Sequence, residues 1–336
     1  MKKIRVAING FGRIGRITLR QLLRYPDVSI VAINDLADPA TLCHLLKYDS
    51  VHGHFKGRVK VADGHLEVKG QKIRIFSSKA PGSIDWGALK IDVVIESTGK
   101  FVDKENAIKH IEAGARKVII SAPAKAEADD IKYIVLGINE HIISPDDIII
   151  SNASCTTNCV APMIKVLDDI WGIEEGFITT VHSYTRDQNL IDAPHSDWRR
   201  GRAAAYSIIP TTTGAAKAAT KIFPHLEHNL GGAGIRVPVP DGSLTDLTCT
   251  LRKSASIKAI NSAFRKAAQG KLKGILQYTE DPIVSIDIIG NTHSAVFDAG
   301  LTAVLGDKNN LVKIVAWYDN ECGYAARLAE LVLKFA

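Results

Sequence analysis

Residues 4–15 of the chain read IRVAINGFGRIG, an apolar run followed directly by glycines at positions 10, 12 and 15. The run 4–8 predicts a buried strand, and the spacing of apolar residues after it predicts a helix. The first glycine permits a tight turn, the second lets phosphates approach the backbone, and the third lets the helix pack closely on the strand. Because anions are stabilised at helix N-termini, this stretch predicts a strand–turn–helix unit that binds a dinucleotide.

An acidic residue supports this interpretation. Asp35 closes the apolar run 28–33, twenty residues after Gly15. A carboxylate at that place can accept hydrogen bonds from an adenosine ribose. Three glycines in six residues also occur in plain turns, but the combination of strand, turn, helix and acid favours the dinucleotide site.

The first 150 residues alternate strand-like and helix-like segments. Strands are predicted at 4–8, 28–33, 93–95 and 118–120, and helices at 14–24, 39–46 and 104–113. This alternation indicates βαβ units and a mostly parallel, doubly wound sheet. A stretch of period-two alternation at 57–76, with Asp63-Gly64 between two runs, predicts an antiparallel hairpin within it.

The pattern changes after Ser151. A helix at 155–170 has an apolar stripe, and strand-like runs follow at 177–183, 234–238, 245–251 and 312–317. They predict a separate α+β domain whose largely antiparallel sheet is covered on one side by helices. The fold class is therefore α/β, a Rossmann-type dinucleotide-binding domain plus an α+β catalytic domain. A polar, Arg-rich segment at 184–206 has little periodicity, which is more typical of functional loops than of filler.

Composition excludes several classes of protein. The 336 residues are 46% hydrophobic and 23% charged, the net charge is +6, and no apolar run is long enough to cross a bilayer. The N-terminus lacks the apolar segment of a secretory signal, so we expect a cytoplasmic protein without a membrane partner. Five scattered cysteines without a CxxC pair argue against disulfides and against a metal site. Dispersed basic residues and only 6% aromatics argue against nucleic-acid binding as a primary role.

Two residues are candidates for covalent chemistry. Cys155 begins a predicted helix, where the N-terminus favours an anion and can lower a thiol pKa. His182 ends an apolar strand. Both also fit structural roles, as a small residue in a polar loop and a satisfied histidine at the rim of the core. The residues alone leave their partnership open.

Several residues could bind anions. Arg199, Arg200 and Arg202 form a charge run that would equally suit a solvated face or a subunit contact. A Thr-Thr-Thr-Gly sequence at 211–214 could be an anion-binding helix start or a plain N-cap. Arg236 is the most informative, because a guanidinium within the apolar run 234–238 needs an anionic partner.

Taken together, these motifs resemble the glyceraldehyde-3-phosphate dehydrogenase family. The resemblance runs from one end of the chain to the other and is most specific in the string Ser-Asn-Ala-Ser-Cys-Thr-Thr-Asn. The matching segments are 8–16, 34–35, 97–99, 151–159, 182–185, 207–217, 236–238 and 317–321.

The resemblance implies roles for individual residues. Cys155 would be the nucleophile and His182 its base. The cofactor would be NAD, held by Gly10, Phe11, Gly12, Arg13, Ile14, Gly15, Asn34, Asp35, Lys79, Ser97, Thr98, Gly99, Ser121 and Asn320. Glyceraldehyde 3-phosphate and inorganic phosphate would be held by Ser154, Thr156, Thr185, Arg199, Thr213, Gly214 and Arg236.

The resemblance also implies an architecture. An NAD-binding domain at 1–150 would be completed by a C-terminal helix at 320–336, and a catalytic domain would occupy 151–319. The family is usually homotetrameric, with the 184–206 loop at subunit contacts. The reaction would be phosphorylating oxidation of the aldehyde through a hemithioacetal and a thioester on Cys155, in glycolysis or gluconeogenesis.

The sequence departs from the family pattern at three places. Cys322 stands where an aromatic is common, Ala325 where serine is common, and Ala193 where NAD-using members often carry leucine. The last leaves residual NADP use open. Alternatives are an erythrose-4-phosphate dehydrogenase and a catalytically silent NAD-binding protein, which intact segments 211–217 and 151–159 disfavour. Cys43, Cys159, Cys249 and Cys322 fit buried apolar positions better than reactive ones.

Overall fold

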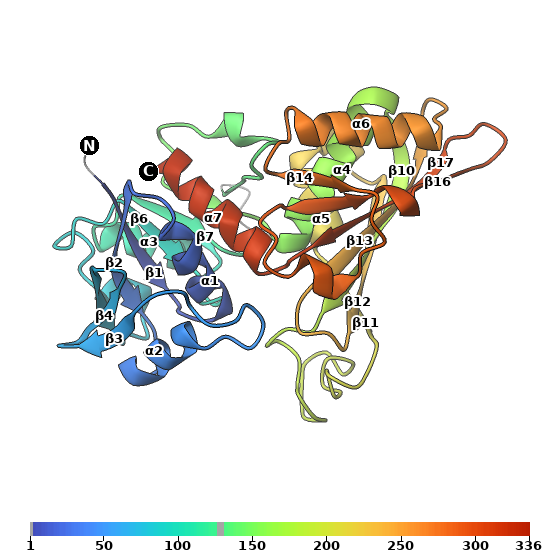
Figure 1. Cartoon of the computed structure of the whole chain (residues 1–336). Coiled ribbons are helices and arrows are strands. Elements are labelled where there is room, and N and C mark those ends of the chain that lie inside the picture. The colour runs from blue at the N-terminus through green and yellow to red at the C-terminus, as the bar shows by residue number, and fades with distance from the viewer. Residues whose placement is uncertain (1–2, 126–130) are drawn as a thin grey trace. The chain divides into compact units, whose positions relative to one another are not determined.

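The computed structural model describes residues 3–125 and 131–336, which form two compact units (Figure 1). The first unit comprises Met1–Ile134, Glu140–Ala153 and Ala325–Ala336. The second comprises Val135–Asn139 and Ser154–Tyr324.

The first unit is built on a nine-stranded sheet with the order β3-β4-β5-β2-β1-β6-β7-β9-β8. From β5 to β8 every neighbouring pair is parallel, as the alternation of strands and helices predicts. The strands are β1 (Ile4–Asn9), β2 (Val28–Asn34), β3 (Val59–Ala62), β4 (His65–Val68), β5 (Gln71–Phe76), β6 (Val93–Glu96), β7 (Lys117–Ile120), β8 (Lys132–Tyr133) and β9 (Ile149–Ser151). Its helices include α1 (Arg13–Leu22), α2 (Pro39–Lys47) and α3 (Lys104–Glu112).

The predicted hairpin is only part of segment 57–76. Strands β3 and β4 pair antiparallel, and the two residues between them, Asp63 and Gly64, have φ of 49° and 71°. Positive φ at both central residues is the signature of a two-residue turn that matches strand twist. Strand β5 then pairs with β4 antiparallel and with β2 parallel, so it joins the hairpin to the parallel sheet.

A buried polar network ties together the carboxyl ends of the central strands. Glu96, at the end of β6, accepts hydrogen bonds from Asn9 of β1 and, at 3.1 Å, from His110 of α3. The indole of Trp86 donates to His110 Nδ1 at 3.1 Å. Since an indole N–H can only donate, Nδ1 is the acceptor and Nε2 carries the proton that His110 gives to Glu96. His110 is thus a neutral, fully buried tautomer with both nitrogens used.

The second unit contains an eight-stranded sheet with the order β11-β12-β10-β13-β17-β15-β14, to which β16 adds by pairing with β17. It is largely antiparallel, but β10–β12 and β14–β15 are parallel pairs. The strands are β10 (Ile173–Ser183), β11 (Ile209–Thr211), β12 (Leu230–Val237), β13 (Ser243–Leu251), β14 (Leu276–Thr279), β15 (Ala295–Asp298), β16 (Ala303–Leu305) and β17 (Leu311–Tyr318).

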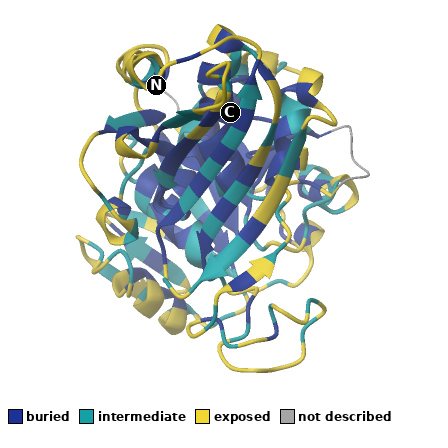
Figure 2. Ribbon diagram, turned by 90° about the vertical axis from the view of Figure 1, so that its right-hand side faces the viewer, coloured by how far each residue is buried: buried dark blue, intermediate teal, exposed yellow. Residues whose placement is uncertain are grey.

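Helix α4 (Cys155–Trp171) is the centre of the core of this unit. The apolar stripe that the sequence predicts, Val160, Met163, Ile164 and Leu167, is fully buried. The helix packs on β10, β13, β15 and β17 and contacts α5 (Ala215–Ile222) and α6 (Ile257–Gln269) (Figure 1). The central strand β13 alternates between buried and partly exposed residues, so one face of the sheet receives the helix; Figure 2 shows this banding along the strands.

Helix α7 (Cys322–Phe335) follows β17 after a short turn. No helix within residues 3–125 and 131–336 combines the length and apolarity that crossing a membrane requires.

The His110 network gives a stability prediction. His110→Ala leaves the buried Trp86 indole N–H without its acceptor and removes one hydrogen bond from Glu96, which keeps those from Asn9 and Thr98, so we expect the free energy of unfolding to fall by about 1–3 kcal/mol. Urea titration followed by tryptophan fluorescence measures this. His141→Ala, on an exposed histidine of the same unit, is the control and should change it by no more than about 0.5 kcal/mol. Equal effects of the two variants would contradict the role of the network.

Candidate active site

The glycines in the turn of the first unit have different roles: two are required by close packing, and one has open space around it. Gly10 has φ of +95°, and a Cβ there would lie 2.6 Å from backbone atoms of Ser97 and Thr98. A Cβ on Gly15 would lie 2.2 Å from the carbonyl oxygen of Gly10. Around Gly12, in contrast, a Cβ would meet no heavy atom within 4 Å. The fold therefore requires Gly10 and Gly15, whereas Gly12 leaves space at the start of α1 for a ligand's phosphates.

The start of α1 and Asp35 offer complementary chemistry. Gly12 is the N-cap of α1 and gives no side-chain cap, and the first turn holds no acidic residue. Asp35 accepts the N–H of Phe11 at 2.8 Å and that of Ala37 at 3.0 Å. These bonds fix the carboxylate beside the glycine turn and leave lone pairs for hydroxyl donors. The residues present fit a dinucleotide, with pyrophosphate at the helix start and ribose at the carboxylate.

Other predicted cofactor residues of this unit shape the scaffold around the turn. The Arg13 guanidinium lies 3.0 Å from Asp49, and the Asn34 amide donates to Asn9 at 2.7 Å and to the Ser78 carbonyl at 3.0 Å. The Ser97 hydroxyl donates to the Gly10 carbonyl at 2.6 Å. Thr98 bonds to Glu96 through its N–H at 2.9 Å. Lys79 is exposed, Ile14 and Ser121 are partly buried, and Gly99 has φ of +71°.

The second unit brings the two candidate catalytic residues together. Cys155 is the first residue of α4, whose N-cap Ser154 accepts the N–H of Thr157 at 3.0 Å. His182 lies near the end of β10, and its Nε2 is 3.4 Å from Cys155 Sγ. The distance fits a hydrogen bond to sulfur, which is the geometry that a thiol nucleophile and its base require.

Two groups contact His182 Nδ1, the ring nitrogen that does not face the thiol. The Ser183 carbonyl oxygen, which only accepts hydrogen bonds, lies 2.8 Å from Nδ1 and favours a proton there, which leaves the Nε2 lone pair toward the Cys155 thiol. A guanidinium nitrogen of Arg236, which only donates, lies 2.5 Å from the same Nδ1 and favours the opposite tautomer. The Arg236 guanidinium also reaches the Ser183 carbonyl, at 3.1 Å, and lies next to the His182 ring. Strand register explains this, because His182 of β10 pairs with Arg236 of β12.

Burial and charge keep both residues neutral in the free protein. Burial raises the pKa of the Cys155 thiol, and the Arg236 cation and hydrogen bonds at Thr156 lower it in part. Burial, followed by the Arg236 cation, lowers the pKa of His182 to about 3. The sequence predicts a lowered thiol pKa at a helix start, but desolvation is the larger effect here. The resting pair is a thiol next to a neutral imidazole.

A hydroxyl network beneath the pair was not predicted. The Tyr318 hydroxyl bonds to Thr156 at 2.9 Å and to Thr180 at 2.8 Å, and its ring meets the His182 ring edge-on at 6.0 Å. Tyr318 lies in a segment that matches the family but has no predicted role, and Thr180 is not among the predicted site residues. Thr180 is a polar residue at a buried position of a strand, which is the signal that could have identified it.

The candidate anion binders are not equally placed. Arg236 lies at the catalytic pair, and Thr156 is buried against Tyr318. Thr213 accepts the N–H of Ala215 at 3.2 Å at the start of α5, which packs on α4, with exposed Gly214 as its N-cap. The Thr185 N–H donates to Gln188 at 3.3 Å, and Arg199 is exposed.

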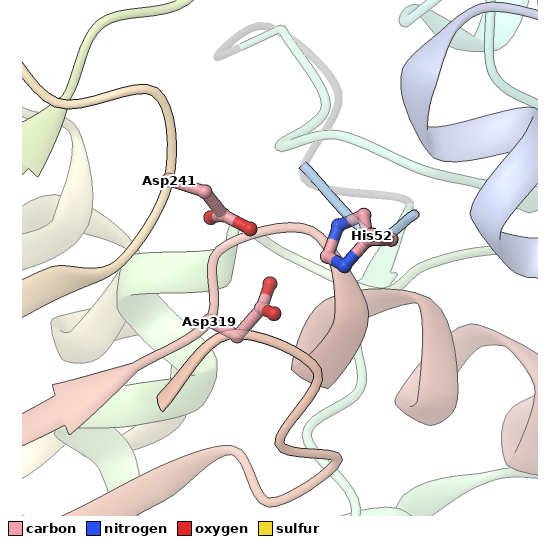
Figure 3. A group of neighbouring side chains, drawn as sticks. All are labelled: His52, Asp241 and Asp319. Atoms are coloured by element: carbon pink, nitrogen blue, oxygen red, sulfur yellow. The ribbon is translucent and has the colours of Figure 1, made fainter. Parts of the chain in front are cut away.

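Two acids lie close together, Asp319 in the turn after β17 and Asp241 in the segment before β13. Each is 1% exposed, and their carboxyl groups, shown in Figure 3, have oxygens within 4.8 Å of one another. Burial, then the charges of Asp319 and Glu321, raise the pKa of Asp241 to about 9. Asp319 accepts the N–H of Gly290 at 2.7 Å and that of Glu321 at 2.9 Å. Burial and the neighbouring charges therefore favour the neutral form of Asp241.

A Rossmann sheet with an open glycine turn, together with a thiol–imidazole pair, defines an NAD-dependent oxidoreductase, and comparison with known proteins identifies its family. The profile of the glyceraldehyde 3-phosphate dehydrogenase NAD binding domain matches residues 4–104, and that of the C-terminal domain matches residues 154–320. The chain is 52% identical over 334 residues to glyceraldehyde-3-phosphate dehydrogenase of Geobacillus stearothermophilus, covering 99% of this chain and 98% of the relative. It is 54% identical over 333 residues to that of Streptomyces coelicolor, covering 98% of each chain. The chain belongs to the glyceraldehyde-3-phosphate dehydrogenase family, and its cofactor is NAD.

The acid pair predicts how stability changes with pH. In the unfolded chain Asp241 loses its proton above about pH 4, whereas in the folded chain it keeps the proton up to about pH 9. The folded state then binds more protons across this range, so Asp241 lowers stability as pH rises from about 4 to 9. Asp241→Asn imitates the neutral acid, and we expect it to raise Tm at pH 8 by about 2–4 °C or more and to have little effect at pH 4. Scanning calorimetry at both pH values tests this, and an equal shift at both would contradict it.

Proposed function

We propose that this protein oxidises D-glyceraldehyde 3-phosphate to 1,3-bisphosphoglycerate with reduction of NAD, through a hemithioacetal and a thioester on Cys155. The observation that carries the proposal is the 3.4 Å contact between Cys155 Sγ, at the start of α4, and His182 Nε2. The relatives over the full length of the chain bear the name of this activity. They do not favour an erythrose-4-phosphate dehydrogenase or a silent binding protein.

The first step uses groups of the second unit. His182 Nε2 takes the thiol proton as Cys155 Sγ attacks the aldehyde carbon, which gives a hemithioacetal. That proton then passes, directly or through solvent, to the alkoxide oxygen of the adduct and makes its hydroxyl group, so Nε2 is again free to accept the hydroxyl proton as the carbonyl reforms. His182 holds that proton weakly while Arg236 is unneutralised. A substrate phosphate that neutralises Arg236 would raise the pKa of His182 and make it a better base.

NAD, when bound, accepts the hydride that the hemithioacetal carbon gives up. Gly10, Gly12 and the backbone at the start of α1 would hold its pyrophosphate, and Asp35 its adenosine ribose. Asn320 would hold the nicotinamide amide. Lys79, Ser97, Thr98, Gly99 and Ser121 would line the remaining path, with Phe11, Arg13, Ile14, Gly15 and Asn34 supporting the turn.

Two phosphate groups are then needed near one thiol. We propose Arg236, Arg199 and Thr185 for the substrate phosphate, and Ser154, Thr156, Thr213 and Gly214 for the inorganic phosphate that attacks the thioester. Charge-assisted bonds from guanidinium and backbone N–H groups suit both anions. The thioester carries the oxidation energy into the acyl phosphate.

We further propose a cytoplasmic homotetramer in which residues 184–206 form subunit contacts. Support comes from large apolar side chains of this segment that are exposed in the single chain: Leu190 (74%), Ile191 (74%), Trp198 (88%) and Tyr206 (92%). Exposed apolar groups gathered in one segment typically mark an interaction surface. We assign NAD binding to residues 1–150 and 320–336, and catalysis to 151–319.

The function is tested by NADH formation from glyceraldehyde 3-phosphate with and without phosphate or arsenate. We expect strong dependence on the added anion. Cys155→Ser should lower kcat by about 10³-fold or more, because it removes the nucleophile. Cys159→Ser is the matched control, since Cys159 is fully buried four residues further along α4 and should retain most activity. Turnover independent of phosphate would indicate thioester hydrolysis instead, and loss of activity in both cysteine variants would contradict the assignment of the nucleophile.

The role of Arg236 is tested by comparing two substrates. Arg236→Leu removes a cation from the phosphate site, so kcat/KM for glyceraldehyde 3-phosphate should fall about 10- to 100-fold more than kcat/KM for unphosphorylated glyceraldehyde. Arg265→Leu, which removes an exposed ion pair with Glu280, is the control and should affect neither. If the Arg236 variant loses the same factor on both substrates, the guanidinium supports structure rather than phosphate recognition.

A further inference from the structure

Asn320 lies in the turn between β17 and α7, and its side-chain oxygen accepts two hydrogen bonds. The Ser243 hydroxyl donates to Oδ1 at 2.6 Å, and the Ser183 hydroxyl donates to it at 3.0 Å. All three residues are buried, with Asn320 7% exposed. The two serines come from the beginning of β13 and the end of β10.

A third contact favours Ser243 as the donor in its bond to Asn320. The backbone N–H of Ser183 donates to Ser243 Oγ at 3.1 Å. This occupies one lone pair of the hydroxyl, and its single proton is directed to Asn320. If the Asn320 amide were reversed, its NH₂ would face two hydroxyls and both hydroxyl protons would lose their acceptor. The hydroxyls therefore determine which end of the amide is the oxygen.

The backbone that carries Asn320 is also held. Asp319 Oδ1 accepts the N–H groups of Glu321 and Cys322 at 2.9 and 2.6 Å, directly after Asn320. The carboxyl of Asp241, two residues before Ser243, has an oxygen within 4.8 Å of a carboxyl oxygen of Asp319 (Figure 3). Strand pairing adds to this, because Ser243 is opposite Tyr318 in the β13–β17 register. Both the turn and the side chain of Asn320 thus have one orientation.

Within the described residues, no group accepts a hydrogen bond from Asn320 Nδ2. The Asn320 oxygen already accepts two hydrogen bonds, whereas its N–H donors are unused. Such an amide is suited to a ligand that presents a carbonyl oxygen. We infer that Ser183 and Ser243 are positioning residues for the cofactor: they orient the Asn320 amide so that Nδ2 donates to the carboxamide oxygen of the nicotinamide. This inference rests on the proposed role of Asn320 at the nicotinamide.

The test compares binding of NAD with binding of ADP-ribose, which shares the adenosine and pyrophosphate but lacks nicotinamide. Calorimetric titration gives Kd for both ligands. Ser243→Ala should raise Kd for NAD about 5- to 10-fold, corresponding to one hydrogen bond, and change Kd for ADP-ribose less than about 2-fold. Thr248→Val removes another hydroxyl from β13, one that bonds to Asp246 at 3.0 Å, and should leave both values unchanged.

A double-mutant cycle shows whether the serine acts through Asn320. In an Asn320→Ala background, Ser243→Ala should cause no further loss of NAD affinity. Ser183→Ala provides an independent variant if Ser243→Ala folds poorly, and Ser243→Cys, which retains a weak donor, should recover part of the affinity. Thermal unfolding of the ligand-free variants separates general destabilisation from a specific effect on nicotinamide.

The outcomes are distinguishable. If Asn320→Ala weakens NAD but not ADP-ribose while both serine variants bind NAD normally, the positioning inference is wrong and the role of Asn320 stands. If Asn320→Ala itself does not separate the two ligands, the role proposed for Asn320 is wrong and the inference falls with it. Additive losses in the cycle would also overturn the inference.

Discussion

The chemistry of this protein depends on placing a thiol and an imidazole in a site where neither is readily charged. Cys155 at the start of α4 and His182 on β10 meet there because α4 packs against the sheet that contains β10. Water would let both groups ionise separately. Burial makes each ionic form costly, so charge is favoured only when proton transfer and a compensating ion occur together. The Arg236 cation lowers the pKa of both groups, so an anion bound to it would change the reactivity that we propose for the pair.

Strand register brings the remaining groups to this pair. The parallel pairing of β10 with β12 aligns His182 with Arg236, and the antiparallel pairing of β13 with β17 aligns Ser243 with Tyr318. Tyr318 then reaches Thr156 and Thr180 beneath the pair. The sheet thus brings the hydroxyl groups of Thr180 on β10 and Tyr318 on β17, which flank β13, within hydrogen-bonding distance of one another.

The sequence could predict the parts with strong local signals. The glycine turn with Asp35, the alternation of strands and helices, and the apolar stripe of α4 predict both folds, and the matching segments indicate the chemistry. It could not predict contacts that depend on register between distant strands, such as those of Ser243, Thr180 and Tyr318. It also gave the thiol pKa the wrong direction, because helix position is visible in a sequence but the extent of desolvation is not. The role of each site residue stays a prediction until it is measured.

Ser183 has each of its polar groups committed to a different neighbour. Its N–H bonds to Ser243, its carbonyl oxygen to His182 and Arg236, and its hydroxyl to Asn320. A shift of this one peptide would alter the orientations of His182 and of the Asn320 amide at once. If the groups that bind at these two places respond to that peptide, each must change the affinity of the other by the same factor. Ser183 would then connect the two places without any movement of larger elements.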